Sequence, residues 1–201
     1  MRARNKRAAV VAVAGAAAVG ALFATAAPST AATVRLSYAA TGSTALTGLG
    51  ATLPLGPGTA TVEGDLQQGA ITGSVDLPES RTKFLLGGFL DTHAKVKVTP
   101  TTPLTGTIKA GVVDVSGQFQ VQITEVGHFD IGIPLQNCKT TEPVTIALKS
   151  GAGFNPSTGG TLTGTYKLPR FADCFVDTEI INLLVVGKDN TISIDLKGDN
   201  R

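Results

Sequence analysis

Two histidines are the only side chains in this 201-residue sequence that are suited to proton transfer near neutral pH. His93 lies in a stretch of alternating character, on the same side as charged residues, and His128 follows Gly127 in an expected turn. No serine lies in the Gly-x-Ser-x-Gly sequence that exposes a nucleophile on a sharp turn. Both histidines are therefore predicted to be solvated surface residues, and the protein is predicted not to be an enzyme.

Metal and phosphate sites are also not predicted. Glu125, His128 and Asp130 form a local group of possible ligands, but their spacing matches no metal-binding loop. The glycine-rich stretches 151–153 and 159–160 are not followed by the lysine of a phosphate-binding loop, so they predict turns. We therefore predict no cofactor and no bound metal.

The first 32 residues have the parts of an export signal. A basic start, residues 2–7, leads into a run of alanine, valine and glycine at 8–24, and small residues suited to signal peptidase follow. Such a short, alanine-rich stretch is a poor membrane span. We predict a cleaved signal peptide at 1–32 and one secreted, extracellular or cell-envelope domain at 33–201, with no transmembrane anchor after cleavage.

The charge of the exported part excludes one class of partner. Residues 1–32 hold four of the 17 Lys and Arg residues and none of the 15 Asp and Glu residues, so the remaining chain is slightly acidic. It also has no cluster of basic residues. Nucleic acids require a concentrated basic surface, so no nucleic-acid partner is predicted.

The sequence has two cysteines, Cys138 and Cys174, and both lie in the exported part. Outside the cytoplasm such a pair forms a disulfide, and closing a loop of this size contributes roughly 4 kcal/mol of stability on the chain-entropy model. A metal-binding or reactive thiol would need a Cys-x-x-Cys pair or further ligands nearby, and there are none. A structural disulfide is predicted.

Most of residues 33–201 alternate between apolar and polar types, which is typical of antiparallel strands with one face in water. In the clearest stretch, the apolar face is formed by Val113, Val115, Phe119, Val121 and Ile123. The pattern predicts an all-β domain, either an antiparallel β barrel or a closed β sandwich. The run 180–186 does not alternate, and it predicts one short helix near residues 177–184, capped by Asp177.

A second run that does not alternate is the continuous apolar stretch 84–90. It is predicted to be a buried strand and bend. The alternative is an exposed flap that touches a lipid or a partner.

A five-residue pattern of apolar, polar, glycine, polar and apolar residues occurs five times, and each glycine falls on the apolar face. These inward glycines are Gly64, Gly73, Gly106, Gly117 and Gly164. Glycine weakens a strand, so its repetition needs a reason. One reason is sharp coiling of the strands, and the other is space for a ligand, in which case the five glycines are candidate cavity-lining residues.

Several parts of the sequence together resemble a group of small secreted β-rich proteins of actinomycete type. The likeness lies in residues 159–166, Pro169, Cys174, and the segments 181–184 and 187–191. It implies Cys138 as the partner of Cys174 and carries over no site residues. The general plan is similar to exported lipid-binding barrels of the YceI kind, by architecture alone.

Two functions follow as hypotheses. The first is a non-enzymatic interaction or structural module whose strand faces, rich in threonine and glutamine, meet an unknown envelope component. The second is a carrier that binds a lipid or other apolar small molecule inside the barrel, with the 84–90 run near the entrance. An apolar cavity on the order of several hundred Å³, the usual scale of ligand pockets, would favour the carrier, and a densely packed core would exclude it.

Overall fold

The computed structural model describes residues 33–65, 68–129 and 131–198, so the predicted signal peptide lies outside the described residues. The domain is all-β, as predicted, with one short α-helix. In chain order the elements are β1 (Thr33–Leu46), η1 (Thr47–Leu49), β2 (Ala51–Asp65), β3 (Ala70–Asp76), β4 (Ser80–Leu86), β5 (Leu90–Pro100), β6 (Leu104–Lys109), β7 (Val112–His128), β8 (Ile131–Pro134), β9 (Lys139–Thr140), β10 (Val144–Ser150), β11 (Gly159–Lys167), β12 (Phe171–Ala172), η2 (Phe175–Asp177), α1 (Thr178–Val185) and β13 (Asp189–Gly198).

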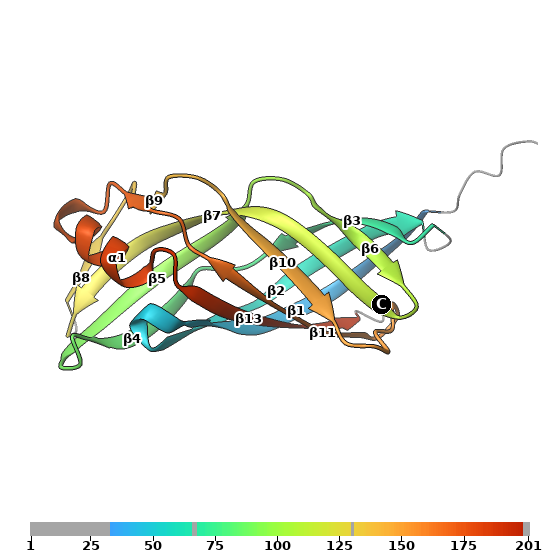
Figure 1. The fold of residues 1–201 in the computed structure, drawn as a ribbon, viewed down its shortest axis with the longest axis horizontal. Helices are drawn as coiled ribbons and strands as arrows, with labels where there is room; N and C mark the ends of the chain where they lie inside the picture. Colours follow the sequence, from blue (N-terminus) through green and yellow to red (C-terminus); the bar gives the residue numbers. More distant parts are fainter. Residues whose placement is uncertain (1–32, 66–67, 130, 199–201) are drawn as a thin grey trace, which may run out of the picture. The chain divides into compact units, whose positions relative to one another are not determined.

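The strands form a closed eight-stranded antiparallel barrel with extra strands (Figure 1). The barrel order is β1, β2, β3, β6, β7, β10, β11 and β13, and β13 pairs with β1. Of the two architectures that the sequence left open, the barrel is therefore the correct one. Closure leaves these strands paired on both sides, which removes the free edges of an open sheet.

Proline residues lie in several of the breaks between consecutive strands. β5 and β6 both pair with β7, and they are separated by a break that contains Pro103. Breaks at Pro78, Pro143 and Pro169 separate β3 from β4, β9 from β10, and β11 from β12. Proline has no backbone N–H to donate to a neighbouring strand, which favours a break in pairing at these four positions.

The predicted alternation places one set of side chains inside the barrel. On β7, Val113, Phe119, Val121 and Ile123 are buried, whereas Gln118 between them is exposed. Pairing extends this inward set across the strands, because Phe119 is opposite Val144 of β10. The core is therefore a column of aliphatic side chains inside the barrel, with threonine, serine and glutamine outside.

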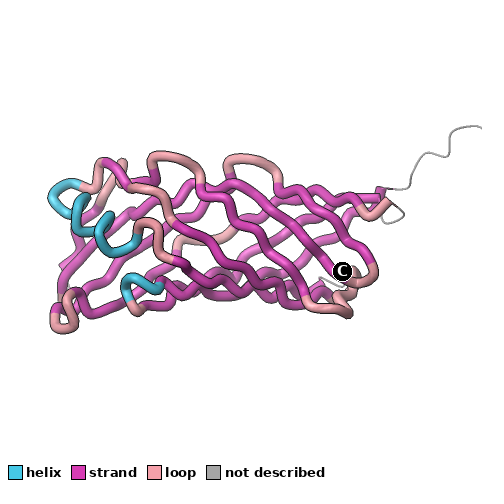
Figure 2. Tube along the Cα trace, in the orientation of Figure 1, coloured by secondary structure: helices cyan, strands magenta, loops and turns pink. Residues whose placement is uncertain are grey.

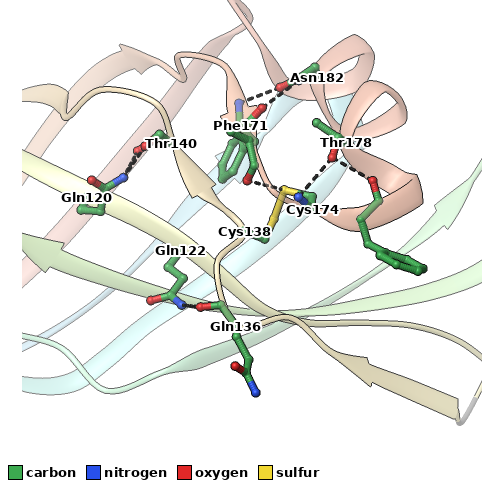
Figure 3. Close-up of a disulfide and its surroundings, with 11 residues drawn as sticks. Gln120, Gln122, Gln136, Cys138, Thr140, Phe171, Cys174, Thr178 and Asn182 are labelled. Carbon is green, nitrogen blue, oxygen red and sulfur yellow. Dashed lines mark hydrogen bonds between the residues drawn. A yellow bond between two sulfur atoms is a disulfide. The ribbon is translucent and has the colours of Figure 1, made fainter.

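The helix α1 corresponds to the predicted one, with a small shift of its bounds. Asp177 is its N-cap residue, but its side chain makes no capping hydrogen bond, contrary to the sequence expectation. Instead, the Asn182 side chain attaches the helix to the barrel. Its Oδ1 accepts from the Phe171 backbone N–H at 2.7 Å, and its Nδ2 donates to the Phe171 carbonyl at 3.0 Å (Figure 3).

The predicted disulfide between Cys138 and Cys174 is present, and both residues are fully buried. It joins the segment before β9 to the residue that precedes η2 (Figure 3). The Cys174 backbone N–H also donates to the Thr178 hydroxyl at 3.1 Å. The disulfide and Asn182 therefore attach the η2–α1 segment to the barrel wall at two separate places.

The helical turns gather near one end of the barrel (Figure 2). There α1 contacts η1 and η2, and η1 also contacts β4. The hairpins β4–β5 and β7–β8 reach the same end, where the Phe129 N–H donates to the Asp91 carbonyl at 2.8 Å. We call this the α1 end, and the opposite end, with the β2–β3, β6–β7 and β10–β11 connections, the turn end.

Candidate functional site

The barrel encloses an apolar cavity of about 220 Å³. Every one of its eight strands contributes to the lining, as do η1 and α1. At the α1 end the cavity meets Leu49 and Leu184, and at the turn end it meets Phe154 and Pro156 from the β10–β11 connection. The Phe154 ring lies 6.5 Å from that of Tyr38, centroid to centroid, which places this connection against the barrel interior.

The inward-facing hydroxyl groups are already paired with protein atoms. Tyr38 donates to the Pro156 carbonyl at 2.6 Å, and Thr82 donates to the Thr52 carbonyl at 2.9 Å. Thr44 donates to the Thr191 carbonyl at 2.9 Å, so the contact of 2.8 Å between Thr44 and Tyr166 has the tyrosine as donor. The middle of the cavity therefore presents hydrocarbon and hydroxyl groups that need no further partner.

Burial affects the two tyrosines that line the cavity. Loss of hydration raises the pKa of Tyr38 and that of Tyr166, since the phenolate would be poorly solvated there. The hydrogen bond with Thr44 partly opposes this effect on the pKa of Tyr166. Both phenols are therefore neutral at physiological pH, and neither brings charge into the cavity.

His128 lines the cavity at the α1 end, although the sequence predicted a solvated turn residue. Its Nδ1 lies 3.0 Å from the Thr92 hydroxyl, and that hydroxyl donates to the Leu90 carbonyl at 3.0 Å. Because Thr92 donates its single hydroxyl hydrogen to Leu90, its oxygen is the acceptor in the contact with His128, and Nδ1–H of His128 is the donor. Asp177, at the start of α1, is the one carboxylate in the lining.

The structure places all five repeated glycines on the inner side of the barrel wall, in register with buried or half-buried apolar residues. Gly73 lines the cavity. At four of the glycines, a Cβ atom would collide with a backbone carbonyl oxygen of the neighbouring strand: Ala70 for Gly64, Thr61 for Gly73, Asp114 for Gly106 and Ala147 for Gly164. These positions are close approaches between strands, which fits sharp coiling of the barrel wall.

Gly117 differs from the other four glycines. A Cβ there would first meet side chains, at 3.1 Å from Leu104 and 3.3 Å from Phe119. The space that a side chain at Gly117 would need is therefore filled by the side chains of Leu104 and Phe119. Four of the glycines lie at close approaches of a neighbouring strand, and the fifth faces packed side chains. Gly73 alone of the five is among the residues that line the cavity, which is bounded chiefly by aliphatic side chains.

His93 is not a solvated surface residue, and the prediction for it was wrong. It lies on the outer face of β5, yet its side chain is only 2% exposed. Its ring covers Gly127 of β7, where a Cβ would collide with Cε1 and Nε2. Glu125 lies 3.5 Å from Nε2, and it accepts a hydrogen bond from Lys95 at 2.8 Å. That bond to Lys95 is the main reason why the pKa of Glu125 is lowered.

The α1 end carries an apolar rim. Among the described residues, the exposed large apolar side chains come from the β4–β5 hairpin, the β7–β8 hairpin and the η2–α1 segment: Leu85, Phe89, Phe129, Ile131, Ile133, Phe175, Val176, Ile180 and Leu183. The 84–90 run was predicted to be buried, but Phe89 is 83% exposed. The run instead forms the tip of a hairpin, while Phe84 and Leu86 line the cavity.

Other kinds of site are less developed in the described part of the chain. A hollow on the outer face of β2, β1, β13 and β11 is lined by small residues such as Ser43, Thr52 and Thr163, and it is open to solvent. No group of His, Cys, Asp and Glu residues within the described ranges could hold a metal ion, and Asp130 of the local group considered above lies outside them. No helix in the same ranges is long and apolar enough to cross a bilayer.

Comparisons with protein-family models, with curated proteins and with solved structures find no match for this chain. The resemblance to small secreted β-rich proteins therefore stays a prediction.

Proposed function

We propose that this protein is an extracellular, non-enzymatic carrier that binds a lipid or other apolar small molecule inside the barrel. One observation carries the proposal, the apolar cavity of about 220 Å³ that the barrel encloses. Close-packed interiors hold few voids larger than a water molecule, so a space of this size needs an explanation. An apolar cavity of roughly 150 Å³ stays dry and binds benzene, so this cavity can hold a hydrocarbon ligand.

The polar contacts of the lining support an apolar cargo. Tyr38, Thr44, Thr82 and Tyr166 all have partners within the protein. A cargo with polar groups along its length would lose hydration without gaining hydrogen bonds, which costs about 1–3 kcal/mol for each group. An apolar cargo avoids this cost and gains about 25 cal/mol per Å² of buried surface.

Two further features support an extracellular location. A disulfide persists in oxidising compartments, and Cys138 and Cys174 form one here. The sequence of residues 1–32 has the pattern of a signal peptide. A protein released with these features would meet apolar compounds outside the cytoplasm.

Native mass spectrometry of the protein recovered gently from its producing cells tests the proposal. The expected spectrum has a discrete added mass that disappears after solvent extraction, and the extract identifies the cargo. The extracted protein should be lighter than the fully reduced chain by two hydrogens because of the disulfide. A bare protein that also takes up no apolar compound in vitro would contradict the carrier function.

The second candidate, an interaction module, is favoured by the apolar rim. Its side chains come from three separate segments, and Phe89, Phe175 and Leu183 are among the most exposed of them. Exposed apolar patches of this kind mark interaction sites in soluble proteins. A bare mass in the experiment above, together with a stably bound second protein, would make this the primary function.

A further inference from the structure

The lining of the cavity extends over most of the barrel's length. β7 is 17 residues long, and Val113 near its start and His128 at its end both line the cavity. A strand of that length measures about 55 Å, or about 40 Å along the barrel axis when strands tilt by 35–45°. Leu184 at the α1 end and Phe154 at the turn end extend the same lining to both ends.

A total volume of about 220 Å³ is small for a space that meets residues at both ends of the barrel. A compact cavity of this volume would touch one or two layers of side chains. Pockets that hold drug-sized ligands usually measure about 300–1,000 Å³. The cavity is therefore elongated rather than compact, a shape that favours a single hydrocarbon chain over a broad ligand.

The distribution of charge adds a second constraint. Asp177 is the one charged side chain in the lining, and it lies at the α1 end. The inward hydroxyls of Thr44, Thr82 and Tyr166 are paired within the protein. A carboxylate or ammonium group in the middle of the barrel would therefore lack a partner, which is strongly unfavourable.

We infer that the cargo is an unbranched hydrocarbon chain that lies along the barrel axis and carries no charged group in the middle of the barrel. This inference rests on the proposed carrier function and narrows its ligand class. It disfavours compact cage-shaped ligands, which would occupy only part of the elongated cavity. It also implies that both ends of the cavity contact the same ligand molecule.

A matched pair of alcohols tests the shape of the ligand. 1-Decanol and 1-adamantanol have the same number of carbons and one hydroxyl each, but the first is a chain and the second is a cage. Isothermal titration calorimetry would be run on the oxidised protein after a hydrophobic resin has removed any cargo. We expect binding of 1-decanol and at least about ten-fold weaker binding of 1-adamantanol.

A series of linear primary alcohols, from hexanol up to chains whose extended length approaches the roughly 40 Å of the lining, tests the orientation. Affinity should rise about four-fold for each added methylene until the chain fills the cavity, because each buried methylene contributes a constant increment. Ile108→Phe at the turn end and Val126→Phe at the α1 end narrow opposite ends of the lining. Each should move the plateau of the series to shorter chains.

Matched controls place the same side chain on the outer face. Thr105→Phe on β6 and Gln118→Phe on β7 replace exposed residues and should leave the series unchanged. Circular dichroism would establish that each variant is folded. If a filling variant does not fold, the alcohol pair and the series on the unaltered protein still decide the shape of the ligand.

The possible outcomes separate this inference from the carrier function. Binding of neither alcohol would overturn both. Binding of 1-adamantanol as tightly as 1-decanol would overturn the chain-shaped ligand and leave the carrier function standing. If only one of the two filling variants shifts the plateau, the ligand is confined to one end of the cavity. That result would also overturn the chain along the barrel axis and leave the carrier function standing.

Discussion

Gly127 lets a histidine side chain be buried on the outside of the barrel. The ring of His93 lies where a Cβ of Gly127 would be, and the carboxylate of Glu125 covers Gly132 of β8 in the same way. Pairing aligns His93 with Gly127 and Gly127 with Gly132, so each glycine receives the side chain of the strand beside it. In this row β5, β7 and β8 lie side by side, and two polar side chains cover two glycines.

Gly127→Ala should therefore destabilise the protein by about 1–3 kcal/mol, because the new methyl group collides with the Ile131 backbone carbonyl oxygen and with the His93 ring. Urea unfolding followed by circular dichroism would measure the loss. Gly151→Ala is the control, since a Cβ at that position meets nothing within 4 Å. Equal stability of the two variants would show that the covering of Gly127 contributes nothing.

At the scale of elements, one amide side chain connects α1 to β12 by two hydrogen bonds. Asn182 is buried and satisfies both the N–H and the carbonyl of Phe171, although it belongs to an otherwise apolar run. Leu183 and Ile180, which lie three residues apart on the helix, are exposed to solvent. The helix is therefore attached through hydrogen bonds on one side, and it leaves part of its apolar surface uncovered.

Asn182→Ala should cost about 2–4 kcal/mol, because it leaves a buried donor and a buried acceptor of Phe171 without partners. Leu183→Ala on the same helix removes an exposed side chain and should change stability by less than about 0.5 kcal/mol. Chemical denaturation of both variants with the disulfide intact gives the comparison. Hydrogen exchange at the Phe171 amide should accelerate in the first variant alone.

Local patterns in the sequence predicted most of the elements. Alternation indicated the strands that pair in the barrel. The run 180–186 indicated the helix, and the cysteine pair indicated the disulfide. These signals lie within a few residues of one another or concern a single pair, so they can be found without knowing the fold.

Contacts between distant strands could not be predicted in this way. Burial of His93 depends on which residue of β7 lies beside it, and the placement of His128 depends on the end of the barrel it reaches. The repeated glycines left two interpretations open because coiling and ligand space call for the same residue. The cavity depends on the summed volumes of many inward side chains, which no single motif encodes.

At the scale of the whole molecule, pairing of the first and last strands brings the two ends of the domain together. Tyr38 of β1 is opposite Gly198 of β13, and Thr33 begins β1 five positions earlier. Those residues extend by about 17 Å, which a flexible linker of about eight residues can span. The connection 151–158 at the turn end contains exposed glycines whose Cβ positions are open.

A circular permutant that joins residue 198 to residue 33 and opens the chain at Gly151 should therefore fold to the same barrel. Near-ultraviolet circular dichroism and 1-decanol binding should both be retained, with stability lowered by about 1–2 kcal/mol from the lost β10–β11 connection. A permutant opened at Ala94, inside β5, is the control and should not fold. Failure of the first permutant would contradict the placement of the two ends.

The pairing of β1 with β13 also sets an order of events during synthesis. β1 and β2 are made first and can pair at once, but the other edge of β1 stays open until the final strand has been made. The interior is not enclosed before then. Without β13 the barrel would stay open between β1 and β11, which would expose unpaired strand edges and the apolar interior to aggregation.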